Sequence, residues 1–291
     1  MRTRAISAIG VIIAGLVPSL LGGPVFLVLM GTLTLVGWLE YATLSARLPF
    51  APRIPPTGGL AILGMLLAGY FNWPAPVIVG MLAITFAAPL VAQFTDPTNP
   101  GAISGWALAV AGSLYLGIPA LSATWLRSLQ APVSAGWMQH LSDRTALAWP
   151  SAPAGLSWTL VVILVTWIAD TAAYLVGRSV GRHKLAPRLS PNKTIEGALG
   201  GLAGAVLVSL ACFSLFGLPG GPLWAVISGL LLGVAGQIGD LSESLMKRQA
   251  GVKDSGDIIP GHGGILDRID ALLFAFPVGW MLAVAISALG R

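Results

Sequence analysis

Apolar stretches of about 20 residues without a single charge recur along this chain and restrict its fold more than any other feature. Hydrophobic residues make up 55% of the 291 and charged residues 9%, whereas a soluble domain carries about 25% charged residues. A stretch of this length crosses the roughly 30 Å hydrocarbon core of a bilayer as a helix. Peptide groups find no hydrogen-bond partners in hydrocarbon, so only helices and closed barrels span it. Because the stretches lack the alternation of barrel strands, they predict an all-α, polytopic transmembrane helical bundle.

The apolar stretches predict about nine transmembrane helices. Short turns that contain Gly or Pro separate several of them, as expected between antiparallel neighbours. The first stretch has no clear cleavage site and is followed at once by a second one, so we interpret it as a retained helix rather than a signal peptide. The predicted spans are 5–21, 24–45, 58–71, 74–93, 101–121, 155–177, 195–217, 220–239 and 265–289.

The distribution of basic residues predicts the orientation of these spans, because Lys and Arg accumulate in cytoplasmic loops. With the N-terminus inside, nine spans place 13 of the 16 Lys and Arg on the inner side. Only Arg127, Arg144 and Arg291 then lie outside. A wrong number of helices would mix the two groups, so we expect the N-terminus in and the C-terminus out. The net charge of +5 is explained by this topology, and no nucleic-acid partner is expected.

Spans and charges together divide the chain into three parts. Residues 1–121 form the N-terminal transmembrane helices. The outside segment 122–154 contains three tryptophans and few charges, and part of it is expected to lie along the outer interface, where indole rings are favoured. A plain loop explains this segment equally well. Residues 155–291 contain most of the charged residues and form the predicted catalytic transmembrane region.

Carboxylates gather in an inner segment, 240–270, in a pattern that indicates chemistry. Asp240 and Lys247 lie about two helical turns apart where the eighth span leaves the membrane, and Asp267 and Asp270 lie one turn apart at the start of the ninth. Carboxylates bind a hard cation such as Mg²⁺, and basic residues neutralise phosphate oxygens. Salt bridges at the membrane edge explain an isolated Lys or Arg better, but three carboxylates favour a site for a Mg²⁺–nucleoside triphosphate.

A Gly-rich turn lies between these carboxylates at residues 260–264, Pro-Gly-His-Gly-Gly. Its amide groups are able to surround a phosphate. We expect His262 to donate to phosphate rather than to bind metal, whereas His140 and His183 are interpreted as facing solvent. Asp170 lies well inside the sixth span, and a structural role and a catalytic role explain it equally well.

Residues 244–270 resemble the signature of the phosphatidate cytidylyltransferase (CDP-diacylglycerol synthase) family. The signature consists of Ser, any residue, an aliphatic residue, Lys-Arg, four residues and Lys-Asp, then His-Gly-Gly, an aliphatic, any residue, Asp-Arg, an aliphatic and Asp. The segment matches every specified position. Residues 190–197, Ser-Pro-Asn-Lys-Thr-Ile-Glu-Gly, resemble a second block of the family, with Ile195 where many members have Trp. Residues 37–40, Gly-Trp-Leu-Glu, resemble a weaker third element.

This resemblance implies the transfer of CMP from CTP to phosphatidate, which gives CDP-diacylglycerol and pyrophosphate for phospholipid synthesis. It places the chain in a bacterial inner membrane, with its site facing the cytoplasm and open to membrane lipids. It leaves open the division of basic residues between CTP and the lipid phosphate, and the oligomeric state, a homodimer included.

The resemblance also assigns residues. Mg²⁺ is expected at Asp240 and Asp267, with Asp270 as an additional ligand, although another divalent ion or an accompanying monovalent cation would fit the same donors. The expected catalytic residues are Asp240, Asp267, Lys247 and Arg268. The expected nucleotide- and phosphate-binding residues are Ser190, Lys193, Thr194, Arg248, Lys253, His262, Gly263 and Gly264.

Two other functions remain as alternatives. A transporter of an anionic solute would explain polar residues near the membrane, but not a Lys-Asp…His-Gly-Gly loop outside the spans. A nucleotidyltransferase that acts on another lipid phosphate would use the same residues. The Asp-Gly-(x)₂-Ala-Arg signature of CDP-alcohol phosphotransferases is absent from the sequence, which disfavours that neighbouring family.

Overall fold

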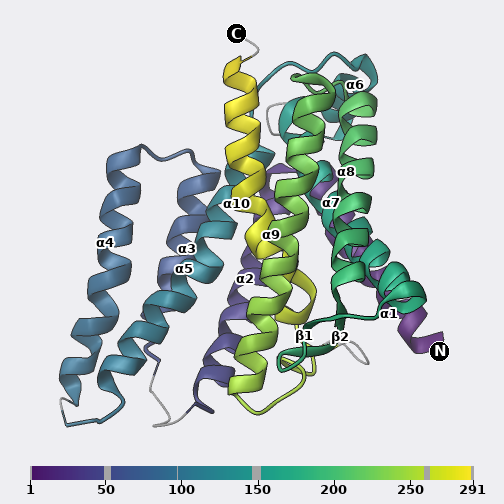
Figure 1. The fold of residues 1–291 in the computed structure, drawn as a ribbon. Coiled ribbons are helices and arrows are strands. Elements are labelled where there is room, and N and C mark those ends of the chain that lie inside the picture. Colours follow the sequence, from purple (N-terminus) through teal and green to yellow (C-terminus); the bar gives the residue numbers. More distant parts are fainter. Residues whose placement is uncertain (1, 49–53, 97, 146–151, 259–262, 290–291) are drawn as a thin grey trace. The chain divides into compact units, whose positions relative to one another are not determined.

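The computed structural model describes residues 2–48, 54–96, 98–145, 152–258 and 263–289, and Figure 1 shows the order of the elements along the chain. The α-helices are α1 (Arg2–Leu21), α2 (Gly23–Ser45), α3 (Thr57–Tyr70), α4 (Ala75–Ala92), α5 (Ala102–Arg127), α6 (Gly136–Thr145), α7 (Pro153–Val180), α8 (Ile195–Phe216), α9 (Gly221–Gln249) and α10 (Leu266–Leu289). A 3₁₀ helix, η1 (Gln93–Thr95), follows α4, and the strands β1 (Lys184–Ala186) and β2 (Ser190–Thr194) lie between α7 and α8. The protein is an all-α, polytopic membrane protein with one added β-hairpin.

A helix is present at each of the nine predicted spans, but not all of these helices are long enough to cross a bilayer by themselves. In the part of the chain that the structure describes, seven helices have the required length and hydropathy: α2, α4 with η1, α5, α7, α8, α9 and α10. The apolar part of α1, Ile12–Leu21, and the whole of α3 are shorter. The structure therefore supports seven spans by length and composition, and the predicted count of nine is not confirmed.

The chain forms two compact units, both discontinuous in sequence. The first contains the N-terminal residues up to Gly15, Leu27–Trp125 and Leu245–Ile269, and the second contains Leu16–Phe26, Leu126–Ser244 and the segment from Asp270 onward. Each unit is described by itself below. The three-part division predicted from the sequence concerns membrane placement and stays a prediction.

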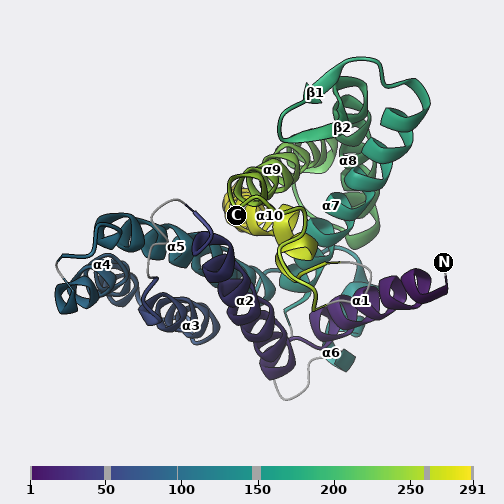
Figure 2. The same ribbon diagram turned by 90° about the horizontal axis from the view of Figure 1, so that it is seen from below.

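In the first unit, bulky aromatic residues of α2 lie against glycines of neighbouring helices. The rings of Trp38 and Tyr41 stack with their centroids 5.9 Å apart. A Cβ atom at Gly58 of α3 would clash with Trp38, and one at Gly112 of α5 would clash with Tyr41, so both helices approach α2 closely only because these residues are glycines. Seen end-on in Figure 2, α3 lies beside α4 in the same unit. This packing fixes the last turns of α2, which carry Glu40.

In the second unit, α7 and α8 pack along each other through small residues. A Cβ at Gly201 would lie 3.0 Å from both the Ala169 carbonyl and the Ala173 Cβ, and one at Gly204 would lie 2.7 Å from the Ala172 Cβ. Helices in membranes commonly associate through such small residues, because these let the backbones come close. The α7–α8 pair therefore forms a rigid base for the hairpin that connects the two helices.

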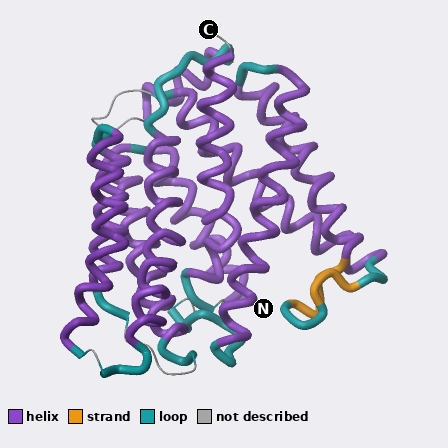
Figure 3. Tube along the Cα trace, turned by 60° about the vertical axis from the view of Figure 1, so that its left-hand side comes forward, coloured by secondary structure: helices purple, strands orange, loops and turns teal. Residues whose placement is uncertain are grey.

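The β-hairpin was not predicted from the sequence. Lys184 pairs with Thr194 and Ala186 with Ser190 in an antiparallel ladder, drawn in orange in Figure 3. Glu196, in the first turn of α8, accepts hydrogen bonds from the backbone N–H of Arg182 at 3.1 Å and of His183 at 3.2 Å. The hairpin thus depends on a carboxylate outside its own strands, which strand propensity does not reveal.

Arg127 is one of the three basic residues that the topology places outside, but it is not a free loop charge. Its side chain is buried, and its Nε donates to the Ser19 carbonyl at 2.7 Å and its Nη2 to the Leu20 carbonyl at 2.9 Å. A positive charge at a helix C-terminus stabilises the helix, because the last carbonyls have no partners within it. Arg127 therefore caps α1 within the second unit.

The segment predicted to lie outside, residues 122–154, contains α6, whose Trp137 is 45% exposed. The Trp137 Nε1–H donates to the Leu215 carbonyl at 3.0 Å, and its ring packs against Phe216. This half-exposed indole fits the predicted interfacial placement of part of the segment. The third tryptophan of the segment, Trp149, lies outside the described residues.

Candidate active site

The predicted site residues are distributed over both compact units. The first unit contains Lys247, Arg248, Lys253, Gly263, Gly264, Asp267 and Arg268, and the second contains Ser190, Lys193, Thr194, Asp240 and Asp270. His262 lies outside the described residues.

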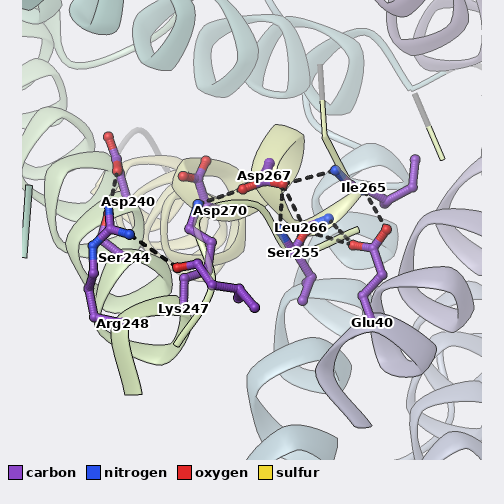
Figure 4. A network of polar contacts seen from close by, with 12 residues as sticks. Glu40, Asp240, Ser244, Lys247, Arg248, Ser255, Ile265, Leu266, Asp267 and Asp270 are labelled. Atoms are coloured by element: carbon purple, nitrogen blue, oxygen red, sulfur yellow. Dashed lines mark hydrogen bonds and ion pairs between the residues drawn. The ribbon is translucent and has the colours of Figure 1, made fainter. Parts of the chain in front are cut away.

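In the first unit, Asp267 is the centre of a dense network at the start of α10 (Figure 4). Its Oδ1 accepts a hydrogen bond from the Lys247 Nζ at 2.5 Å. Its Oδ2 accepts from the Ser255 N–H at 2.8 Å, the Ser255 hydroxyl at 2.9 Å and the Gly264 N–H at 2.9 Å. The side chain is only 6% exposed. Three donors therefore surround Oδ2 and one lies beside Oδ1, and the carboxylate has a fixed orientation.

Lys247 reaches Asp267 because α9 continues beyond its apolar part and then stops sharply. The chain turns at Gly251, which has a positive φ of 69°, a conformation that glycine adopts without strain. The Val252 N–H closes the turn by donating to the Lys247 carbonyl at 2.9 Å. The Arg248 side chain donates to the Val252 carbonyl at 3.1 Å. These contacts hold the basic end of α9 in place.

Glu40 was not among the predicted site residues, yet it joins the same network. Its Oε1 accepts from the Ile265 N–H at 2.9 Å, and its Oε2 accepts from the Leu266 N–H at 2.8 Å and the Ser255 hydroxyl at 3.0 Å. The residue is 6% exposed. Glu40 thus supplies acceptors to backbone N–H groups at the start of α10, which have no partner inside the helix. The signal that could have identified Glu40 is a carboxylate in an otherwise apolar helix.

Gly264 completes the network by leaving space for two side chains. A Cβ atom at this position would clash with the Ser255 hydroxyl and the Glu40 carboxylate. Gly263 has a positive φ of 82°, which a side chain would strain. Both predicted phosphate-binding glycines therefore have a structural reason to be glycine, in addition to any contact with phosphate.

In the second unit, Lys193 of β2 forms an ion pair with Asp240 of α9. The Ser244 hydroxyl lies 3.5 Å from the Asp240 Oδ1, on the same helix. Thr194 accepts a hydrogen bond from the Gly197 N–H at 3.1 Å and so caps α8. The hairpin and the helix cap together place Lys193 beside Asp240.

A cavity of about 550 Å³ opens around this ion pair in the second unit. Three predicted site residues line it: Lys193, Thr194 and Asp240. Ser190 lies at the other end of β2 and is not among the lining residues. The polar residues that line the cavity and that were not predicted as site residues are Asp170, Tyr174, Arg178, Asn192 and Gln237.

The remaining predicted residues differ in exposure. Arg248, Lys253 and Arg268 are exposed, as phosphate-binding side chains require. The Asp270 Oδ1 accepts from the Ala271 N–H at 2.7 Å. His183 is exposed as expected, but its Nδ1 also contacts the Glu196 Oε1 at 2.6 Å.

The expected Mg²⁺ ligands are all carboxylates, whose oxygens are donors of the kind that a hard cation prefers. Within the described ranges, no group of three or more His, Cys, Asp or Glu side chains is arranged to hold a metal ion. Asp240 and Asp267 instead each contact a lysine ammonium. Each of these carboxylates thus has a positive charge beside its oxygens in the protein without Mg²⁺.

The network predicts that Glu40→Gln lowers activity, because one acceptor oxygen becomes an NH₂ group that faces backbone N–H donors. A lost hydrogen bond to a charged group corresponds to about 1.5–3 kcal/mol, so we expect kcat to fall by at least about tenfold. The measurement is transfer of CMP from CTP to phosphatidate by purified protein, the activity that the family resemblance of the sequence implies. Asp257→Asn, an exposed carboxylate in the same loop, is the control and should leave kcat unchanged. An unchanged kcat in Glu40→Gln would show that Glu40 is not needed to orient Asp267 for catalysis.

Comparisons with known proteins identify the family to which this chain belongs. Residues 2–286 match the sequence model described as the Cytidylyltransferase family. The chain is 37% identical over 277 residues to the phosphatidate cytidylyltransferase of Brucella suis biovar 1 (strain 1330), which covers 94% of this chain and 90% of that protein. It is 50% identical over 127 residues to the phosphatidate cytidylyltransferase of Staphylococcus aureus (strain COL), covering 43% of this chain and 48% of that protein. The chain therefore belongs to the cytidylyltransferase family.

Proposed function

We propose that this protein transfers CMP from CTP to phosphatidate and releases pyrophosphate. Its relatives of nearly full length are phosphatidate cytidylyltransferases. The observation that carries the proposal is the network around Asp267, which is built from the residues of the family signature and from Glu40. An oriented carboxylate beside a lysine is suited to a reaction whose catalysis depends on charge neutralisation.

The reaction itself requires little acid–base chemistry. An oxygen of the lipid phosphate attacks the α-phosphorus of CTP, a new P–O bond forms, and the bond to the β-phosphate oxygen breaks. The second pKa of a phosphomonoester is about 6, so the attacking group is largely ionised at neutral pH. A strong general base is unnecessary, and positioning of the two anions becomes the main task.

The basic residues perform this task in the proposed mechanism. Lys193 and Lys247 each contact a carboxylate in the protein without substrate and would neutralise phosphate oxygens when the substrates bind. Arg248, Lys253 and Arg268 are exposed and would extend this positive region. Because two anions must approach each other, the reaction needs more positive charge than either substrate alone would require.

Asp240 and Asp267 are the proposed ligands of Mg²⁺, with Asp270 as an additional ligand. When bound, Mg²⁺ would neutralise charge on the triphosphate and on the departing pyrophosphate. Groups of this chain orient the ligands: the backbone N–H groups of Ser255 and Gly264 donate to Asp267, and the Ser244 hydroxyl lies beside Asp240.

We further propose nine spans in a bacterial inner membrane, with the N-terminus in the cytoplasm and the C-terminus outside. The segregation of basic residues supports this orientation. The contact between Arg127 and the end of α1 also supports this orientation. Arg127 is one of the few basic residues on the predicted outer side, and its role as a helix cap explains its presence there. At 14 residues, α3 is about 21 Å long and would cross with the help of flanking aromatic residues and local thinning.

The metal assignment predicts that Asp240→Asn and Asp267→Asn each abolish turnover. Loss of one anionic ligand removes several kcal/mol of charge stabilisation, which corresponds to at least a 10²-fold lower rate. The assay is lipid labelling from radioactive CTP, with phosphatidate and saturating Mg²⁺. Asp143→Asn on α6 is the control, because its carboxylate accepts an exposed hydrogen bond from Gln139 and is not a predicted site residue. Near-wild-type turnover in either variant would remove that residue from the site.

The nine-span topology predicts that the two ends of α3 lie on opposite sides of the membrane. In a Cys212→Ala background, an impermeant maleimide should label Phe71→Cys in spheroplasts, and Arg47→Cys only after permeabilisation. Both sites lie beside helix ends, and Phe71 is 58% exposed. An alkaline phosphatase fused after Arg291 should be active. If both cysteines react from the same side, α3 does not cross and the count of nine is wrong.

A further inference from the structure

The cavity of the second unit contains two hydrogen-bond acceptors that the proposed mechanism does not use. Asp170 of α7 and Gln237 of α9 both line this space of about 550 Å³. The carboxylate of Asp170 is accessible from the cavity, since the residue is exposed although it lies ten residues inside the end of α7. A polar group at such a depth in a membrane helix calls for a partner.

The orientation of the Gln237 amide is fixed by a neighbour. Its Nε2 donates to the Ala198 carbonyl at 3.0 Å, which leaves Oε1 as the acceptor that the side chain can offer. A Cβ atom at Gly201 would lie 3.5 Å from this Nε2 and 3.0 Å from the Ala169 carbonyl. Gln237 therefore lies against the turn of α7 that also carries Asp170.

Phosphate groups are expected at other residues of the same cavity. Lys193 and Arg178 supply positive charge, and the Arg178 Nη1 donates to the Tyr174 hydroxyl at 3.1 Å. Asp240, which lines the same cavity, is already assigned to Mg²⁺ and through it to the phosphates, whereas Asp170 and Gln237 have no such role and are available to a different portion of a substrate.

The two proposed substrates differ in the donors that they carry. In phosphatidate, all three glycerol oxygens are esterified, so the glycerol part offers only acceptors. CTP has three donor groups outside its phosphates: the exocyclic amine of cytosine and two ribose hydroxyls. The acceptors Asp170 and Gln237 therefore match the nucleoside and not the lipid. Two acceptors also match the two N–H bonds of a single amine.

We propose that Asp170 and Gln237 bind the exocyclic amine of cytosine and so select CTP over UTP, an inference that rests on the proposed function. Uracil carries a carbonyl oxygen in place of the amine, which would face two acceptors without a hydrogen. A site built to bind a donor discriminates strongly against an analogue that lacks it, because its own polar groups are then left unpaired.

Turnover of CTP and UTP tests the selection. We expect Asp170→Asn to lower the ratio of kcat/KM for CTP to that for UTP by at least about tenfold, because a carboxamide is able to donate to uracil. Gln237→Met, a second variant of similar size, should also lower the ratio. Tyr174→Phe, which alters the same cavity without removing an acceptor of this pair, is the control and should keep the wild-type ratio. A general loss of activity cancels in the ratio.

Binding to the wild-type protein tests the same inference without turnover. CTP and 2′-deoxy-CTP should raise the Tm of the purified protein more than the triphosphate of pyrimidin-2-one riboside, which lacks the amine and keeps both hydroxyls. Equal shifts with CTP and this analogue would overturn the inference, and a loss confined to 2′-deoxy-CTP would assign the acceptors to ribose instead. Wild-type discrimination retained in Asp170→Asn would overturn this inference alone, whereas failure of the wild-type protein to bind CTP would contradict the proposed function as well.

Discussion

Two buried carboxylates hold the start of α10, and the site in the first unit depends on them. Burial of an ionised group costs several kcal/mol unless donors replace its water. Glu40 and Asp267 meet this requirement with backbone and side-chain donors: Ser255, Gly264, Ile265 and Leu266. The same bonds satisfy N–H groups at the helix start. One arrangement therefore lets the chain fold and gives the Asp267 carboxylate a single orientation.

The proposed site also depends on two lysines that neutralise the charge of its carboxylates. Lys247 beside Asp267 and Lys193 beside Asp240 balance the charge of the two carboxylates. Partial burial strengthens such pairs relative to fully exposed ones. The phosphates of the substrates would compete with the carboxylates for the same ammonium groups. On binding, a phosphate would take the place of a carboxylate beside each lysine, so that no lysine is left without a negative partner. The proposed chemistry thus follows from the charge balance of the protein without substrate.

Periodicity and charge predicted the helices well because the bilayer permits few other structures. Helices begin and end within a few residues of the predicted spans, except where polar extensions continue, as in α9 to Gln249. Hydropathy does not determine the number of spans, because the apolar parts of α1 and α3 are short.

Other parts could not be read from local sequence. The hairpin has short strands that contain or adjoin prolines, and a carboxylate of α8 holds it together. Glu40 contacts residues that lie 225 and 226 positions away, a distance at which no spacing rule applies. The signature identified Asp267 and Lys247, whereas the residues that orient them can be identified only from the three-dimensional structure. Asp170 was noticed for its depth, but only the cavity relates it to Gln237.

The most direct test of the account is the fate of each phosphorus atom of CTP in a reaction with purified protein and phosphatidate. Attack at the α-phosphorus predicts that an α-phosphorus label appears in the lipid and a γ-phosphorus label in pyrophosphate, in equal amounts. Transfer of the γ label to lipid, or release of the γ label as free phosphate without any labelled lipid, would contradict cytidylyl transfer.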